Sequence, residues 1–268
     1  MVTMAAADIL ADLAQTQPRI TRLDDRDLKS RWGSGRYYDV EGVGSLPSVT
    51  TILNVISKPA LVPWARNLAL EHARAALLDS PRPASFSSYQ EWVEHTIAKA
   101  KAWPDKVKDQ AADFGTRLHA LIEGYIKAPE LPLDIPEDMR PPFDAFLAWQ
   151  EESQVTIHLA EFMVYSRRGY AGTVDAIATR GDELVVVDWK TSNAVYPEMA
   201  LQLGAYGAAL EEMLDHRIPV AETWVLRLGK TKPEFEARRA PEGAYEGFDG
   251  ALTLFKALQG VKKAWKKR

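Results

Sequence analysis

The spacing of hydrophobic positions changes from a helical to a strand period near residue 155. Before that point apolar residues recur every three or four positions, most clearly over 105–127, where Phe114, Leu118 and Ile122 share one face. From 155 to 190 the period is two, which is typical of strands. The pattern predicts a hairpin within 36–53, helices over 62–79, 88–103, 105–127 and 143–153, strands over 155–166, 169–180 and 183–191, a helix over 197–214, a strand over 222–230 and a helix from 244 onward.

This order of elements predicts an α/β fold, in which a small mixed sheet is flanked by helices. We expect a single domain over 1–268 with three parts. An accessory N-terminal region of hairpin and helices covers 1–110, a core covers 111–230, and a helical, basic tail covers 231–268. The proline-rich stretch at 128–142 predicts a loop.

The most informative feature is the pair of strands around Gly181-Asp182. Gly-Asp is a favoured two-residue hairpin loop, because glycine accepts positive φ. Such a loop places Asp175 directly opposite Asp188, and a four-residue loop does the same, whereas a three-residue loop does not. Facing residues on one sheet face have Cβ atoms about 4.5–5.5 Å apart.

Two facing carboxylates destabilise a sheet unless a cation lies between them. Hard oxygen ligands at that distance suit Mg²⁺ or Mn²⁺. Lys190 lies two residues after Asp188 and shares its face, while the Trp189 side chain points into the opposite layer and leaves its carbonyl as a candidate ligand. Asp188 follows the apolar run 184–187, where a carboxylate is costly unless it is paired or metal-bound. The alternative is an Asp–Lys pair on an edge strand.

Four further positions could complete a site. His119 shares a helical strip with Thr116 and Glu123 and is a candidate third ligand, or else a structural histidine. Glu161 shares a face with apolar residues and so needs a partner, unless it lies at the sheet margin. Gln202 and Tyr206 lie four residues apart on a predicted helix and offer an amide and a hydroxyl to phosphate oxygens. The alternative is that the pair is ordinary helix surface.

The composition excludes several classes of site. The 268 residues contain no cysteine, which excludes disulfides, cysteine zinc sites, iron–sulfur clusters and a cysteine nucleophile. The formal net charge is −4, so binding to a polyanion requires a local patch such as the five basic residues in 262–268. No apolar run approaches the length of a membrane span, and the N-terminal segment lacks the basic start of a signal peptide, so we expect a cytoplasmic protein with no membrane contact.

Together these residues resemble the PD-(D/E)XK nuclease superfamily, most closely its RecB-like exonuclease branch, over roughly 111–230. The proline of the superfamily's name is Val174 here, and the cysteines that hold an iron–sulfur cluster in several relatives are missing. A softer similarity connects 47–65 with phage-encoded members. The matching motifs are Gly115-Thr116-x-x-His119, Glu161, Gly172-x-x-Asp175, Asp188-Trp189-Lys190 and Gln202-x-x-x-Tyr206.

The resemblance implies a restriction-endonuclease-like αβββαβ core and cleavage of DNA that depends on Mg²⁺ or Mn²⁺. It implies His119, Asp175 and Asp188 as metal ligands and Lys190 as a catalytic residue that orients or deprotonates water. Glu161 or Glu123 would be an extra ligand. The expected DNA contacts are Gln202, Tyr206, Thr116, Arg66 and Arg117.

The function expected from this resemblance is a metal-dependent DNA exonuclease acting on single strands or duplex ends. It would serve recombination, repair or replication in a bacterial or phage-infected cell. Because the sequence has no P-loop motif, unwinding would need a helicase or recombination partner. The alternatives are a structure-specific endonuclease on the same core and a non-catalytic DNA-binding scaffold.

Overall fold

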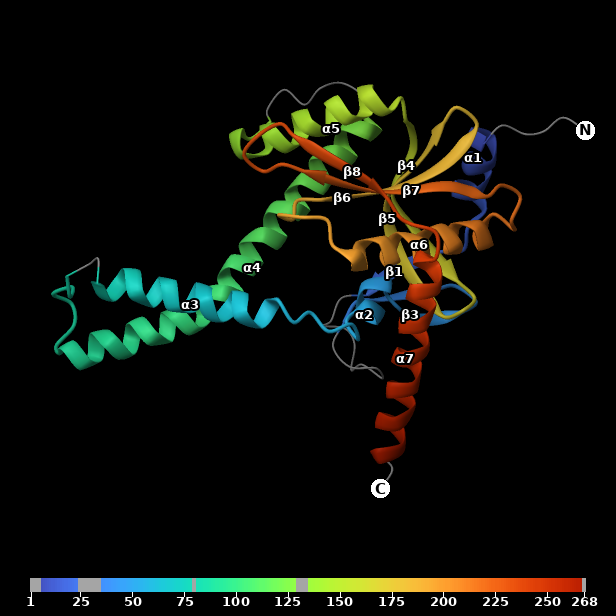
Figure 1. Ribbon diagram of the computed structural model, residues 1–268. Coiled ribbons are helices and arrows are strands. Elements are labelled where there is room, and N and C mark those ends of the chain that lie inside the picture. The colour runs from blue at the N-terminus through green and yellow to red at the C-terminus, as the bar shows by residue number, and fades with distance from the viewer. Residues whose placement is uncertain (1–5, 24–34, 79–80, 129–134, 267–268) are drawn as a thin grey trace, which may run out of the picture. The chain divides into compact units, whose positions relative to one another are not determined.

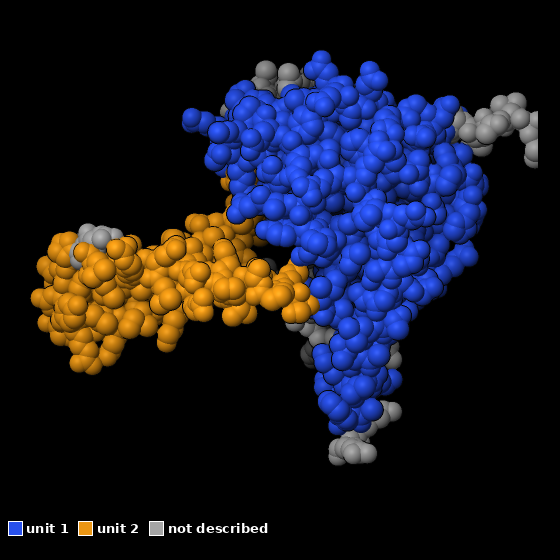
Figure 2. Space-filling view, viewed as in Figure 1, with its two compact units in different colours: residues 1–56, 118–268 blue, residues 57–117 orange. Residues whose placement is uncertain are grey.

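The computed structural model describes residues 6–23, 35–78, 81–128 and 135–266. The chain forms two compact units, one from residues 1–56 and 118–268 and the other from residues 57–117 (Figure 2). The basic residues Lys267 and Arg268 of the expected tail lie outside the described residues. None of the helices in the described ranges is long and apolar enough to cross a membrane.

The first unit is built on a five-stranded mixed sheet in the order β4-β5-β6-β7-β8 (Figure 1). Neighbouring strands are antiparallel except β6 and β7, which are parallel. The α/β class and the small mixed sheet predicted from the sequence are confirmed, although the last strand was not predicted. The strands are β4 (Thr156–Ser166), β5 (Tyr170–Arg180), β6 (Glu183–Lys190), β7 (Val220–Leu228) and β8 (Phe235–Arg239).

The β5–β6 hairpin has the predicted two-residue turn. Gly181 has φ +60°, the conformation that a type II′ turn requires at its first central position. The pairing begins at Arg180 with Glu183 and runs to Ala176 with Val187. This is the predicted register of the hairpin, and its pairing ends one step before Asp175 and Asp188.

Helices cover both faces of this sheet. Helix α6 (Pro197–Met213) connects β6 to β7 and packs with α7 (Ala244–Trp265) over the face that carries Val186. On the opposite face, Phe146 of α5 (Arg140–Ser153) contacts the buried Trp189 ring, with 5.6 Å between the ring centroids. Trp189 therefore packs in the layer opposite Asp188, as the alternation predicted.

The N-terminal segments of this unit form a small second sheet in the order β1-β2-β3. The predicted accessory hairpin is the β2–β3 pair, whereas β1 was not predicted. The residues that follow the hairpin form α2, whose first turn is capped by the Ser48 hydroxyl. Residues 129–134 of the predicted loop over 128–142 lie outside the described residues, and the prediction was wrong at its end, where a short 3₁₀ turn leads into the helix that begins at Arg140. The elements are α1 (Ala6–Thr16), β1 (Ile20–Leu23), β2 (Tyr37–Val40), β3 (Gly44–Pro47), α2 (Val49–Leu53) and η1 (Glu137–Met139).

The second unit is a helical hairpin of α3 (Leu61–Leu78) and most of α4 (Tyr89–Lys127). The prediction of separate helices over 88–103 and 105–127 was wrong, because α4 continues through Pro104. An internal proline costs a helix about 3 kcal/mol. The neighbouring Trp103 ring stacks on His72 of α3, and this packing helps to hold the helix through the proline.

Candidate active site

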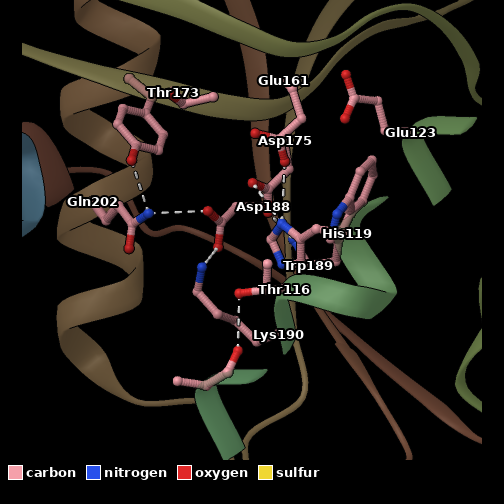
Figure 3. A network of polar contacts seen from close by, with 12 residues as sticks. Thr116, His119, Glu123, Glu161, Thr173, Asp175, Asp188, Trp189, Lys190 and Gln202 are labelled. Carbon is pink, nitrogen blue, oxygen red and sulfur yellow. Dashed lines mark hydrogen bonds and ion pairs between the residues drawn. The ribbon is translucent and has the colours of Figure 1, made fainter. Parts of the chain in front are cut away.

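Asp175 and Asp188 are both buried, with 6% and 1% of their surface exposed, and each is held by its neighbours (Figure 3). The Asp175 Oδ2 atom accepts a hydrogen bond of 2.8 Å from the Trp189 backbone N–H. The Asp188 Oδ1 atom accepts one of 3.0 Å from Gln202 Nε2, and its Oδ2 atom forms an ion pair with the Lys190 ammonium. Both acids are thus fixed in position.

A second group of ligand-type atoms meets at Asp175. The His119 Nδ1 atom lies 3.2 Å from Glu161 Oε1 and 3.4 Å from Asp175 Oδ1. One ligand atom from each of these three residues lies within 4.8 Å of the other two. The cluster brings together the C-terminal part of α4, the middle of β4 and the middle of β5 (Figure 3). One imidazole nitrogen and two carboxylate oxygens are a donor set that suits a divalent cation.

Glu161 has an unusual backbone conformation for a residue inside a strand. Its φ is +50°, and it falls in a gap of the β4–β5 pairing between Ala160 and Phe162. A non-glycine residue in the left-handed region costs on the order of 1–3 kcal/mol. This strained conformation accompanies the contact of the Glu161 side chain with His119. In an unstrained strand, simple alternation would set the direction of that side chain.

The carboxylates control the charge of the two basic groups. Burial opposes the charge of His119, but Asp175 and Glu161 outweigh it and raise the pKa of His119 to about 10. Burial likewise opposes the charge of Lys190, but Asp188 and Asp175 raise the pKa of Lys190 above its ordinary value. The neighbouring carboxylates thus favour the ammonium form of Lys190.

The two aspartates differ in their affinity for a proton. Burial and the charge of Asp175 raise the pKa of Asp188 to about 6. Burial pushes the pKa of Asp175 in the same direction, but His119 and Lys190 more than reverse it, so the pKa of Asp175 lies below its ordinary value. Asp175 is therefore the acid that stays ionised most readily, as a metal ligand must.

A comparison with known protein families finds a match for the region that carries these acids. Residues 143–266 match the model of the PD-(D/E)XK nuclease superfamily. This part of the chain, just under half of its length, is similar to that superfamily. The match supports nuclease activity, and it includes Glu161, both aspartates and Lys190, whereas His119 precedes it. No curated protein matches the sequence.

Comparison with solved structures gives more distant similarities. An alkaline exonuclease from Laribacter hongkongensis is 10% identical, with 76% of this chain and 96% of that chain covered and a TM-score of 0.37. The same exonuclease in complex with dAMP is 10% identical, with coverages of 76% and 94% and a TM-score of 0.36. The protein SSO0001 is 12% identical, with coverages of 72% and 85% and a TM-score of 0.33.

The superfamily motif Gln202-x-x-x-Tyr206 faces the acids in this structure. Gln202 Nε2 donates to Asp188 and lies 3.0 Å from the Tyr206 hydroxyl, and both side chains are buried. Their polar groups therefore support Asp188. Gly172 of β5 makes room for this arrangement, because a Cβ atom at residue 172 would overlap the Tyr206 ring.

Substitution of Gly172 with alanine is expected to disturb the site from a distance. The added methyl group displaces the buried Tyr206 ring, which removes a partner of Gln202 and loosens Asp188. Overpacking of this kind typically costs about 1–3 kcal/mol. We expect a lower urea midpoint and a lower rate of DNA cleavage. Alanine at Gly124, where no atom lies within 4 Å of the added Cβ, is the control: it should leave the cleavage rate unchanged and, because alanine favours a helix over glycine, should not lower the urea midpoint. Equal effects of the two substitutions would contradict this packing role.

The other predicted site residues make contacts of their own. Glu123 does not belong to the His119 cluster, and its carboxylate pairs with Lys127 one turn along α4. The Thr116 hydroxyl donates to a backbone carbonyl of its own helix. Arg66 and Arg117 are exposed, and both belong with Thr116 to the second unit.

Sequence reasoning missed one contact beside the site. The hydroxyl of Tyr38 in the N-terminal sheet lies 2.9 Å from the hydroxyl of Thr173, two residues before Asp175. Neither residue carries a motif or a periodicity that marks it. The contact ties the accessory hairpin to the strand that bears the acid.

Proposed function

We propose that this protein is a DNA exonuclease of the RecB-like branch that requires a divalent metal ion. One observation carries the proposal: the ligand atoms of His119, Glu161 and Asp175 converge within 4.8 Å, beside the ion pair of Asp188 with Lys190. We take residues 111–230 as the catalytic core, within a single functional chain.

The residues of this core fit a divalent cation. Carboxylate oxygens suit Mg²⁺, and the imidazole nitrogen is also acceptable to Mn²⁺. We propose His119, Asp175 and Asp188 as ligands, together with the Trp189 carbonyl, and Glu161 rather than Glu123 as the additional acid. Because the pKa of His119 is about 10, binding of an ion by this imidazole would release a proton.

The ion, when bound, would polarise the phosphate and lower the pKa of a water molecule. The protein residues supply position and charge. The Lys190 ammonium orients that water or stabilises the negative charge that develops at phosphorus. Gln202 holds Asp188, and the Trp189 N–H holds Asp175, so neither acid needs to reorient during the reaction. Gln202 and Tyr206 remain proposed contacts for DNA.

An endonuclease on the same core and a non-catalytic DNA-binding scaffold are the rival functions. The resemblance to the exonuclease branch, together with the helical segment that precedes the core, supports the exonuclease. We propose single strands or duplex ends as substrates, with a role in recombination, repair or replication and a helicase or recombination protein as partner.

An assay on end-labelled linear and closed circular single-stranded DNA separates the three functions. We expect cleavage of the linear substrate alone, with Mg²⁺ present and none in EDTA. Cleavage of both substrates would identify an endonuclease. Cleavage of neither, by folded protein that binds DNA, would identify a scaffold.

A further inference from the structure

The second unit contains a groove that the proposed chemistry does not use. It lies between α3, the loop before α4 and the first half of α4, and its volume is about 690 Å³. Binding sites for small organic groups typically measure roughly 300–1,000 Å³. All of its described lining residues belong to the unit of residues 57–117, drawn in orange in Figure 2.

The lining of the groove is rich in flat rings. The Trp103 indole stacks on His72 with 4.2 Å between the ring centroids and an angle of 16° between the planes. Phe86 lies 5.0 Å from the ring of His95. Trp92 is buried, whereas Trp103 and Phe86 are half-buried and keep part of their surface accessible. Such rings offer stacking surfaces to another flat group.

Lysines are the permanently charged side chains among the described residues that line the groove. Lys99 and Lys106 line it and are exposed, and the Lys106 Nζ atom lies 5.0 Å from the centroid of the Trp103 ring. No carboxylate occurs among its described lining residues, although the chain as a whole has a formal net charge of −4. A ligand that fits this lining carries both a flat ring and a negative charge.

We propose that this groove binds a segment of single-stranded DNA through an unpaired nucleotide. The base stacks on the accessible rings around Trp103, and the phosphates on either side contact the ammonium groups of Lys99 and Lys106. The choice of DNA as the ligand rests on the proposed nuclease function. The requirement for a flat ring and a negative charge in the ligand rests on the residues that line the groove. An unpaired base is required, because a base inside a duplex presents no free face.

Two lysine pairs on α4 provide a matched test. Lys99 and Lys106 line the groove, whereas Lys101 and Lys108 have the same spacing on the same helix, are also exposed and do not line it. Full-length Lys99→Gln/Lys106→Gln and Lys101→Gln/Lys108→Gln proteins would be titrated against labelled oligothymidylate in EDTA, with fluorescence anisotropy as the readout. We expect the groove variant to lose affinity about tenfold and its salt slope to fall by about 1.4, since each contact on a single strand contributes about 0.7. Affinities of the two variants within a factor of two of each other would overturn the proposal.

Trp103 provides a second test that separates stacking from charge. Trp103→Ala should weaken oligothymidylate binding about tenfold, whereas Trp103→Phe, which keeps a ring, should stay within about threefold of the unchanged protein. Circular dichroism of both variants checks that the helical hairpin is intact. If the alanine variant unfolds, the phenylalanine variant and the lysine pairs still decide the question. Equal binding of duplex DNA, or of thymidine monophosphate, would overturn a site for a strand segment.

These measurements are independent of cleavage, because EDTA removes the divalent ions. A protein that binds through Lys99 and Lys106 yet hydrolyses no DNA under any condition would overturn the nuclease proposal alone. A protein that hydrolyses DNA, and whose binding does not depend on Lys99 or Lys106, would overturn the groove alone.

Discussion

Replacement of Lys190 with methionine is expected to lower the rate of DNA cleavage by roughly 10²–10³-fold, the usual effect of removing one fixed charge from a reacting centre. Methionine keeps the length of the side chain and removes the ammonium that pairs with Asp188. Initial rates on end-labelled linear DNA at saturating Mg²⁺ would measure the loss. A folded Lys190→Met protein that keeps more than a tenth of the rate would remove Lys190 from the mechanism.

The same substitution should also destabilise the fold, and a second substitution should reverse that effect. Lys190→Met leaves Asp188 buried without its cation, which costs about 3–5 kcal/mol in a fully buried pair. We expect less, because 24% of the Lys190 side chain is exposed. The double variant Asp188→Asn/Lys190→Met removes both charges and should recover most of the urea midpoint, while its cleavage rate stays low. Recovery of the rate together with the stability would show that the pair has only a structural role.

Addition of Mn²⁺ is expected to raise the melting temperature of the protein through the His119 cluster. An ion that binds only the folded state stabilises it by about 2.7 kcal/mol at one hundred times its dissociation constant. Each of the substitutions His119→Ala, Glu161→Gln and Asp175→Asn should remove most of this increase. Differential scanning calorimetry with Mn²⁺, and with EDTA as the baseline, measures it.

Glu123→Gln is the matched control for these variants, because Glu123 shares α4 with His119 but pairs with Lys127. Its melting temperature should rise with Mn²⁺ as much as that of the unchanged protein. A larger loss for Glu123→Gln than for Glu161→Gln would make Glu123 the additional ligand. A rise that persists in all three cluster variants would place the ion elsewhere.

The register of the acids could be predicted from the sequence for a simple physical reason. Side chains alternate between the two faces of a strand, so the length of one loop decides which residues face each other. The sequence Gly181-Asp182 predicts a two-residue loop, because glycine is the residue that most readily takes the positive φ of such a turn. The positions of Asp175, Asp188 and Lys190 follow from that one turn.

The position of Glu161 could not be predicted in the same way. Alternation along β4 is broken at Glu161 by a left-handed backbone, and no residue type in that strand signals the break. The hydrogen bonds of Gln202 to Asp188 and Tyr206 could not be predicted from the sequence either. A helical pair of polar residues is usually solvated, and only the depth of Asp188 in the sheet turns Gln202 inward.

Two departures from the predicted elements show local preference yielding to tertiary packing. Pro104 predicts a helix end, yet α4 continues through it with Trp103 stacked on the neighbouring helix. Strand β8 has the sequence FEARR, in which only Phe235 and Ala237 are apolar. Its pairing with β7 depends on backbone hydrogen bonds and on ion pairs such as Arg227 with Glu236, which no periodicity reveals.

The metal requirement of the site is tested most directly by release of nucleotides from an end-labelled linear single strand. The unchanged protein and Asp175→Asn would each be assayed with Mg²⁺, with Mn²⁺ and with excess EDTA. We expect release only by the unchanged protein and only with a divalent ion, restored when Mg²⁺ is added back after EDTA. Release in EDTA, or at an undiminished rate by folded Asp175→Asn protein, would contradict a metal centre built on Asp175.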